Sequence, residues 1–389
     1  MIHSLLKTWN LDDKRIFVRA DLNVPLENGK ILNDFRLTSI LPTLDYIIKH
    51  NGNIILATHI GRPKNSDPSL STQLLVPWFK QQGYTITFVA DINSIAQHPI
   101  IPQQIILIEN LRFFPGEKDG DPFFAKQLAR SAHYYVNDAF GVIHHSDCSV
   151  TLLPYEFPEN RRSIGFLMEK ELAALSSLRN NPQHPFVAII GGGKIEDKIP
   201  LIHGLLKTAN TILLCPALCF SFLKALGQPV GKSLVNDNTR ELCTTIINEA
   251  HSSGVHIIFP LDYQVATNTI NGPLSIIPAT NFPENAIGIS IGPKTVEVFT
   301  NEINKAQTIF LNCAMGFADR QETRQSTYNI IKAMAHSTAN TLIAGGDSID
   351  AAFTSGSALS IKHLSIGGGA ALAYLSGAIL PGLAAFEEQ

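Results

Sequence analysis

The chain has 389 residues, which is enough for two or three domains and too many for one small core. Apolar residues make up 45% of it and charged residues 16%, and this composition excludes extensive disorder. Thirty basic and 33 acidic residues leave a formal charge of −3, which excludes the overall positive charge of a nucleic-acid-binding protein, so any anion site must be a local cluster.

Short apolar runs rich in β-branched residues predict five strands in the first part of the chain. The runs are almost continuously hydrophobic, as expected of parallel strands that are covered on both faces. Helix-like segments lie between them, and the alternation predicts βαβ units with a parallel sheet. The expected strands are 16–19, 54–57, 86–89, 105–108 and 134–136, and the expected helices are 37–50, 72–82 and 123–132.

A helical segment at 165–178 and a loop at 180–185 separate this part from a second series of strands and helices. The ten strands together exceed the five or six that are usual for one sheet, so we divide them between two α/β domains. The strands of the second series are expected at 186–190, 211–214, 256–259, 308–311 and 340–344, and its helices at 201–207, 239–252 and 323–336.

The cysteines and the two ends of the sequence help to predict the cellular compartment of the protein. Five cysteines form no C-x-x-C pair, and the first seven residues lack the long apolar region of a signal peptide, so free thiols and a cytoplasmic location are expected. Residues 366–386 carry no charge, yet their five glycines and Pro381 favour a loop and a buried helix over a membrane span. The cysteines are Cys148, Cys215, Cys219, Cys243 and Cys313.

Polar side chains follow the predicted strands of the first domain. Loops at the carboxyl ends of parallel strands meet at one edge of the sheet, where ligands bind. Guanidinium groups there form paired hydrogen bonds with phosphate or carboxylate oxygens. Each residue alone is more simply interpreted as solvated or salt-bridged, but the set favours an anion site. It comprises Asp21, Asn23, Arg36, His59, Arg62, Asn110 and Arg112.

Three glycine-rich loops follow strands of the second domain, at 191–194, 345–348 and 367–369. Glycine amides can approach phosphates closely, and Lys194 and Lys198 add charge to the first loop. Asp347 beside glycines suits a Mg²⁺ that is held together with substrate phosphates. The simpler alternatives are a tight turn for the triple glycine and a helix N-cap for Asp347 or Ser348.

Other motifs carry less weight. Ala188 stands where a P-loop needs glycine, and no loop fits the dinucleotide pattern G-x-G-x-x-G. His144, His145 and Asp147 resemble part of a metal site or a catalytic triad, but the sequence offers no matching third ligand or nucleophile. Asp138 is interpreted as a structural residue.

Seven segments, in order along nearly the whole chain, resemble the phosphoglycerate kinase family. The segments are RADLNVP at 19–25, THIGRP at 58–63, ENLRF at 109–113, NDAFG at 137–141, GGKIEDK at 192–198, GGD at 345–347 and SIGGGA at 365–370. The resemblance implies two Rossmann-like domains that bind 3-phosphoglycerate on the first and Mg-ADP or Mg-ATP on the second. The expected boundaries are a first domain at 1–165, a hinge helix at 166–180, a second domain at 181–370, and a segment at 371–389 that returns to the first domain.

The resemblance also implies roles for individual residues. Those for 3-phosphoglycerate are Asp21, Asn23, Arg36, His59, Arg62 and Arg112, with His145 where the family has an arginine. Those for the nucleotide are Gly192, Gly193, Lys194, Lys198, Asn312, Asp319, Gly345, Gly346, Asp347, Ser348, Gly367 and Gly368. Asp347 is the expected Mg²⁺ ligand, and Arg36, Lys194 and Lys198 are the expected catalytic residues. A monomer without nucleic-acid or membrane partners is expected.

The sequence departs from the family mainly at the nucleotide site, and two functions therefore stay open. One is a working phosphoglycerate kinase, which the retained Arg36, Lys194, Lys198 and Asp347 favour. The other is a catalytically weakened relative that binds phosphoglycerate or another anion as a regulatory protein. The changes at Cys215, Pro216 and Ile366 favour the second, and further departures from the family are His145, Cys313 and Asp319.

Overall fold

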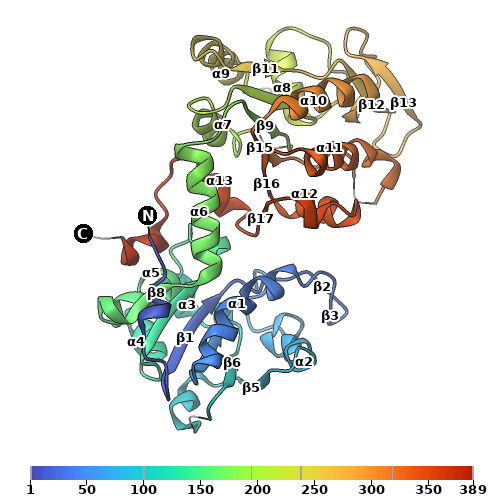
Figure 1. Cartoon of the computed structure of the whole chain (residues 1–389). Helices are drawn as coiled ribbons and strands as arrows, with labels where there is room; N and C mark the ends of the chain where they lie inside the picture. Colours follow the sequence, from blue (N-terminus) through green and yellow to red (C-terminus); the bar gives the residue numbers. More distant parts are fainter. Residues whose placement is uncertain (1, 100, 194, 237–238, 318, 388–389) are drawn as a thin grey trace. The chain divides into compact units, whose positions relative to one another are not determined.

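The computed structural model describes residues 2–99, 101–193, 195–236, 239–317 and 319–387. Contacts along the chain group it into two compact units, one formed by residues 1–173 and 379–389 and the other by residues 174–378. Figure 1 traces the elements of each unit along the chain.

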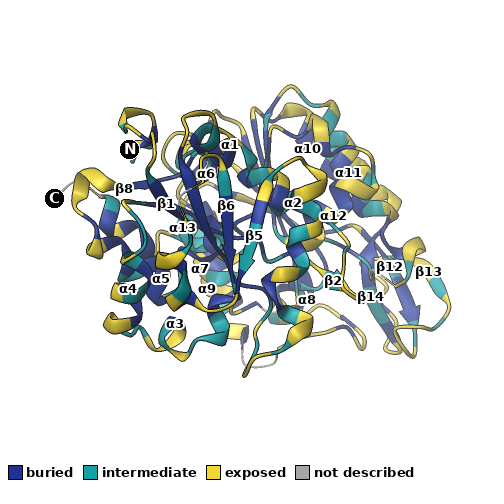
Figure 2. Ribbon diagram, turned by 90° about the horizontal axis from the view of Figure 1, so that it is seen from below, coloured by how far each residue is buried: buried dark blue, intermediate teal, exposed yellow. Residues whose placement is uncertain are grey.

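The first unit is built on a six-stranded parallel sheet in the order β5-β6-β4-β1-β7-β8. Its four inner strands are buried along most or all of their length, as the dark blue ribbons of β1 and β6 show in Figure 2. The bounds are β1 (Arg15–Ala20), β4 (Asn53–Ala57), β5 (Thr85–Val89), β6 (Gln104–Ile108), β7 (Tyr134–Asp138) and β8 (Arg162–Ile164). A short hairpin, β2 (Leu26–Glu27) and β3 (Lys30–Ile31), follows β1.

Helices cover both faces of this sheet because side chains alternate along each strand. On β1, Ile16 and Val18 join the apolar cluster of α1 (Phe35–Lys49) and α2 (Val76–Gln81). Phe17 joins the opposite cluster, which includes α4 (Pro122–Ala129) and α5 (Cys148–Thr151). Two short helices, α3 (Pro115–Asp119) and the 3-10 turn η5 (Leu111–Phe113), lie between β6 and α4 in the chain.

Helix α6 (Phe166–Asn180) begins in the first unit and ends in the second. Its first turn is held by Asp138 at the end of β7, which accepts hydrogen bonds from the Met168 amide at 2.8 Å and the Thr43 hydroxyl at 2.6 Å. Thr43 in turn accepts from the Phe166 amide at 3.0 Å. A Cβ on Gly165 would lie 2.2 Å from Cγ of Asp138, so only glycine lets the carboxylate approach this closely. The start of α6 is thus fixed to β7 and α1.

The chain returns to the first unit after residue 378, where the 3-10 helix η12 (Pro381–Phe386) packs against α5 and β8. The Gly382 amide donates to the Ile143 carbonyl at 3.0 Å, and the Arg162 Nε donates to the Ala385 carbonyl at 2.8 Å. The Phe386 ring stacks on Tyr135 with centroids 6.3 Å apart. This returning segment therefore completes part of the first unit.

The second unit contains a second six-stranded parallel sheet, in the order β11-β10-β9-β15-β16-β17. Its strands are β9 (Phe186–Ile190), β10 (Thr211–Leu214), β11 (His256–Ile258), β15 (Thr308–Asn312), β16 (Asn340–Ala344) and β17 (His363–Ser365). The helices are α7 (Ile199–Leu205), α8 (Leu218–Ala225), α9 (Arg240–Ser252), α10 (Pro293–Lys305), α11 (Gln325–His336), α12 (Gly346–Thr354) and α13 (Gly369–Ser376). Helix α13 packs on α7 within this unit, where a Cβ on Gly204 would lie 2.2 Å from the Leu375 carbonyl oxygen.

The structure confirms the predicted α/β class and two parallel sheets, and it adds elements that the sequence did not predict. A three-stranded antiparallel sheet consists of β12 (Asp262–Thr267), β13 (Leu274–Pro278) and β14 (Ala286–Ile291). Its strands contain partly exposed positions and small residues, so they lack the continuous apolar runs that predicted the other strands. No described helix is long and apolar enough to cross a membrane.

Candidate active site

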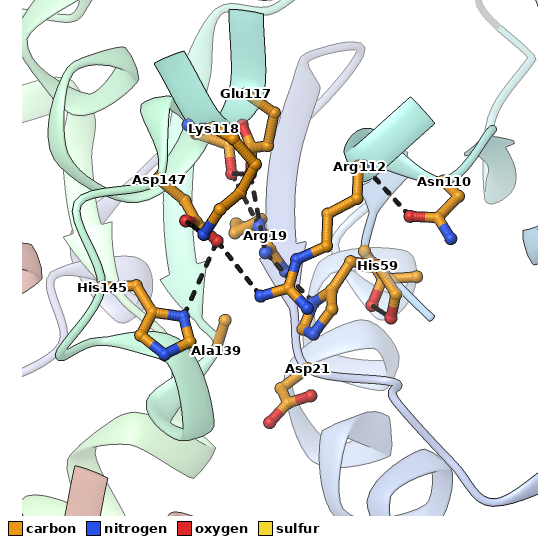
Figure 3. A network of polar contacts seen from close by, with 12 residues as sticks. Arg19, Asp21, His59, Asn110, Arg112, Glu117, Lys118, Ala139, His145 and Asp147 are labelled. Atoms are coloured by element: carbon orange, nitrogen blue, oxygen red, sulfur yellow. Dashed lines mark hydrogen bonds and ion pairs between the residues drawn. The ribbon is translucent and has the colours of Figure 1, made fainter. Parts of the chain in front are cut away.

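The first group of predicted site residues lies at the carboxyl edge of the sheet in the first unit. Asp21 follows β1, His59 follows β4, and Arg112 lies in η5 after β6. Figure 3 shows these three side chains in one network with His145 and Asp147, which follow β7. Residues that are distant in the sequence therefore meet at one edge of the sheet, as expected for loops at the carboxyl ends of parallel strands.

Asp21 is paired with Arg36, from the first turn of α1, through a hydrogen bond from Arg36 Nη1 to Asp21 Oδ2. Burial of Asp21 opposes its ionisation, but the charges of the neighbouring arginines, Arg36 first and then Arg19, outweigh burial and hold the pKa of Asp21 below its usual value. The Arg36 side chain remains 28% exposed. The arginine can therefore meet a ligand while Asp21 fixes its position.

Gly141 makes room for this pair. A Cβ there would lie 1.9 Å from Asp21 Oδ2 and 3.1 Å from Arg36 Nη1. We expect Gly141→Ala to displace Asp21 and to lower the free energy of unfolding by about 1–3 kcal/mol, the usual effect of overpacking. Urea denaturation of the variant measures this loss. In an Asp21→Ala background the same substitution should lower the free energy of unfolding much less. An equal loss in both backgrounds would contradict a clash with Asp21.

Further predicted residues hold the loop that follows β4. Asn23 Oδ1 accepts from the Gly61 amide at 2.8 Å, and Arg112 Nη1 donates to the Gly61 carbonyl at 2.7 Å. Asn110 Nδ2 donates to the carbonyls of Ile60 and Leu70, both at 2.8 Å. Gly61 itself has φ +66°, a left-handed conformation that favours glycine. Arg62, the next residue, is exposed.

Asp147 links the predicted His145 to the cluster. Its carboxylate lies 2.6 Å from Lys118 Nζ, 3.6 Å from Arg112 Nη2 and 3.8 Å from His145 Nδ1. Burial opposes ionisation of Asp147, but His145, Lys118 and Arg19 hold its pKa well below the usual range. The ionised carboxylate thus lies within 4 Å of a side-chain nitrogen of Lys118, Arg112 and His145.

Sequence reasoning missed two buried charged residues beneath this site, Arg19 and Glu117. Arg19 Nη2 lies 3.8 Å from Glu117 Oε1, and both side chains are inaccessible to solvent. Buried charges of this kind need partners, and an arginine inside the apolar run of β1 was the one sequence feature that could have revealed them.

The second group of predicted residues surrounds the loop that follows β9 in the second unit. Lys198 precedes α7 and donates a hydrogen bond from Nζ to Asn312 Oδ1 at the end of β15. Asn312 Nδ2 donates to the Ala344 carbonyl at 2.7 Å, which connects Lys198 to the loop before α12. Gly192 has φ +124°, and a Cβ there would lie 3.2 Å from Lys198 Cε. Lys194 lies outside the described residues.

Two helix N-termini lie in the same unit as this loop, and a helix N-terminus favours the binding of an anion. Helix α12 carries Asp347 exposed and Ser348 buried in its first turn, after Gly345 and Gly346. Helix α13 follows Gly367 and Gly368, and Gly369 at its start lines a cavity of about 640 Å³ together with Gly193 and Lys198. Asp319 is exposed in the turn after β15, and the described contacts do not join it to the others.

A Mg²⁺ ion fits Asp347 when phosphates supply its other ligands. Within the described residues, no group of three or more His, Cys, Asp or Glu side chains could hold a metal ion. Mg²⁺ is commonly bound by one or two carboxylates together with substrate phosphates and water. One exposed carboxylate at a helix N-terminus matches that mode of binding.

The cysteines that depart from the family pattern pack together. Cys215 is fully buried and Cys313 is 3% exposed, and a Cβ on Gly191 would lie 2.4 Å from Cys313 Sγ and 2.9 Å from Cys215 Cβ. Burial and the neighbouring Cys313 thiol raise the pKa of Cys215. All five cysteines are buried free thiols. The Cys215 and Cys313 side chains thus fill the space beside Gly191, away from solvent.

Comparison with known proteins identifies the family. The family profile described as phosphoglycerate kinase matches residues 6–378. A protein of Finegoldia magna named phosphoglycerate kinase is 35% identical over 394 residues, and the match covers 99% of each chain.

This chain belongs to the phosphoglycerate kinase family.

Members of the phosphoglycerate kinase family are phosphotransferases that use a carboxyl group as acceptor. Another relative, a cytosolic phosphoglycerate kinase of Triticum aestivum, is 38% identical, and the match covers 97% of this chain and 96% of the relative. The solved phosphoglycerate kinase of Coxiella burnetii superposes with a TM-score of 0.87 at 29% identity over 99% of both chains. That of Pyrococcus horikoshii gives 0.83 at 27% identity, over 99% of this chain and 98% of the other. Of the two functions that the sequence left open, the kinase is the one that this membership supports.

Proposed function

We propose that this chain catalyses the reversible transfer of a phosphoryl group between 1,3-bisphosphoglycerate and ADP, giving 3-phosphoglycerate and ATP. The observation that carries the proposal is the convergence of Arg36, His59 and Arg112 with Asp21 at one edge of the first sheet. Such a cluster suits a small substrate with a carboxylate and a phosphate. Asn23, Arg62 and His145 complete the proposed 3-phosphoglycerate site.

The nucleotide phosphates are proposed to bind the glycine loops of the second unit. The residues assigned to them are Gly192, Gly193, Lys194, Lys198, Asn312, Gly345, Gly346, Ser348, Gly367 and Gly368, with Asp319 near the ribose. Asp347 would hold a Mg²⁺ ion, which neutralises phosphate charge when bound. Lys198 can neutralise charge on a phosphate because Asn312 already fixes its ammonium group.

The proposed reaction requires positioning of the substrates and stabilisation of the charge on the transferred group, and it does not require acid–base catalysis. A substrate carboxylate is ionised at neutral pH, so no side chain has to remove a proton from it. Arg36, Lys194 and Lys198 are proposed to stabilise the charge on the transferred group. Because the two substrates are assigned to different units, we propose that these act as two domains and that α6 (Phe166–Asn180) serves as a hinge.

The proposed activity is tested by an assay of ATP consumption that depends on 3-phosphoglycerate. We expect Lys198→Met to lower kcat at least about tenfold, because the variant loses a cation at the phosphates. Lys305→Met removes an exposed lysine of α10 and should leave activity unchanged. Wild-type protein that shows no 3-phosphoglycerate-dependent turnover would contradict the proposal.

We further propose that the protein works as a monomer in the cytoplasm, without nucleic-acid or membrane partners. The balanced charge of the chain supports this, as do the relatives from Nicotiana tabacum and Triticum aestivum, which are named cytosolic.

A further inference from the structure

The Arg19 guanidinium is locked in one orientation beneath the 3-phosphoglycerate cluster. Its Nε donates to Ser149 Oγ at 2.7 Å, and its Nη1 donates to the Ala20 carbonyl at 2.5 Å. The partner carboxylate of Glu117 is itself fixed, because it accepts from the Ser149 amide at 2.9 Å and from the Ser149 hydroxyl at 2.6 Å. Arg19 therefore has little freedom to turn away from its neighbours.

The remaining contact of Arg19 is with His59. Nη2 of Arg19 lies 3.4 Å from Nδ1 of His59, and both side chains are buried. A guanidinium group has only hydrogen-bond donors, so Nδ1 has to be the acceptor. An imidazole that accepts at Nδ1 is neutral and carries its proton on Nε2. A charged imidazolium would instead direct an N–H of its own at the guanidinium.

We propose that Arg19 is a positioning residue that holds His59 in the neutral tautomer with its proton on Nε2. On the proposed function, this tautomer gives the substrate site a fixed N–H donor for an anionic oxygen. The donor persists across neutral pH because it does not depend on protonation of the ring. The assignment of the tautomer itself concerns the free protein and does not require the enzyme to be active.

The surroundings of His59 agree with a neutral ring. Burial, followed by the charge of Arg19, lowers the pKa of His59 to about 3. Arg112 acts in the same direction, whereas Asp21 and Asp147 oppose it. These groups come from β1, the loop after β1, η5 and the turn before α5, and they are the charged groups with the largest effect on the ring. The two carboxylates are insufficient to protonate it because each already has an arginine partner.

The tautomer can be read directly by NMR spectroscopy of ligand-free protein with ¹⁵N-labelled histidine. The chain has 13 histidines, and a His59→Gln variant assigns the His59 signals by their loss. We expect the His59 correlations to show an unprotonated Nδ1 and a protonated Nε2, without titration from about pH 5.5 to 8.5. A proton on Nδ1, or a protonation step within that range, would overturn the proposal.

Variants then test whether Arg19 is what holds His59 in this tautomer. Arg19→Met combined with Glu117→Gln removes both buried charges together, so that no unpaired charge remains. We expect the His59 signals of this variant to lose the single-tautomer pattern and to titrate. Arg15→Met is the matched control, since Arg15 is a buried arginine of the same strand that bonds to the carbonyls of Ile95 and His98.

Unchanged His59 signals in the double variant would remove Arg19 from this role. If the double variant does not fold, as judged by circular dichroism, the wild-type spectrum alone decides the tautomer. The dissociation constants of 3-phosphoglycerate for wild type and the double variant at pH 6 and pH 8 add a separate readout, because the titration of the ligand phosphate and of other side chains cancels in their ratio and a titrating His59 makes that ratio depend on pH. Loss of the proposed activity with an intact Nε2–H pattern would refute the function and leave the tautomer assignment standing.

Discussion

Replacing Arg36 with alanine is expected to lower kcat by about 10²–10³-fold and to change the affinity for 3-phosphoglycerate by less than about tenfold. A positioned cation contributes most where charge develops during transfer, and losses of this size are typical when such a group is removed. Arg36 is suited to this role because Asp21 fixes it while part of its side chain stays accessible. Steady-state kinetics with both substrates varied, together with calorimetric titration of 3-phosphoglycerate, separates the two effects.

Two controls accompany this experiment. Arg240→Ala removes an exposed arginine of α9 and should leave kcat unchanged. Asp21→Asn combined with Arg36→Ala removes the carboxylate that the single variant leaves buried without this arginine, so urea denaturation of both shows how much of the loss comes from destabilisation. An Arg36→Ala enzyme with wild-type kcat would exclude Arg36 from charge stabilisation.

Asp138→Asn is expected to change how stability depends on pH. Burial raises the pKa of Asp138 to about 7, although hydrogen bonds from Thr43 and the Met168 amide favour its ionised form. In the unfolded chain an aspartate ionises near pH 4, so between about pH 4 and pH 7 the folded state binds a proton that the unfolded state releases. The stabilising contribution of the protonated carboxyl is therefore full below about pH 4 and is lost as the pH rises to about 7.

Asparagine does not titrate, so the variant should gain stability relative to wild type as the pH rises from 4 to 8. The largest expected change in this difference is about 4 kcal/mol, from three pKa units at 1.36 kcal/mol each. Urea denaturation of both proteins at intervals between pH 5 and pH 8 measures it, and other titrating groups cancel in the difference. Asp12→Asn, at an exposed position, should follow the wild-type curve. If the free energies of unfolding of Asp138→Asn and wild type change in parallel with pH, the raised pKa of Asp138 is contradicted.

The sequence predicted the strands that run through the two parallel sheets, because strands buried on both faces leave continuous apolar runs. It did not predict β8 and β17, because their sequences, RSI and HLS, each contain only one apolar residue. Strand ends placed Asp21, His59 and Arg112 at one edge, and the structure brings them together. The sequence could not show that Arg19 contacts His59, since this depends on which face of β1 the Arg19 side chain occupies and on the burial of Glu117 from a separate helix.

The role of Asp138 shows the same limit. Its sequence context indicated a structural residue, but the partner that it stabilises, the first turn of α6, lies 30 residues further along the chain. Domain boundaries and the roles of individual site residues stay predictions that the experiments above can test.

The returning segment at 379–389 has a consequence for biosynthesis. The ribosome makes residues 174–378 before the segment that places Phe386 on Tyr135 and Gly382 against Ile143. The packing of the first unit can therefore be completed only after the entire second unit has been translated. Until then, the apolar surface around Tyr135 and Val150 lacks its cover, and this is the stage at which the growing chain would most benefit from a chaperone.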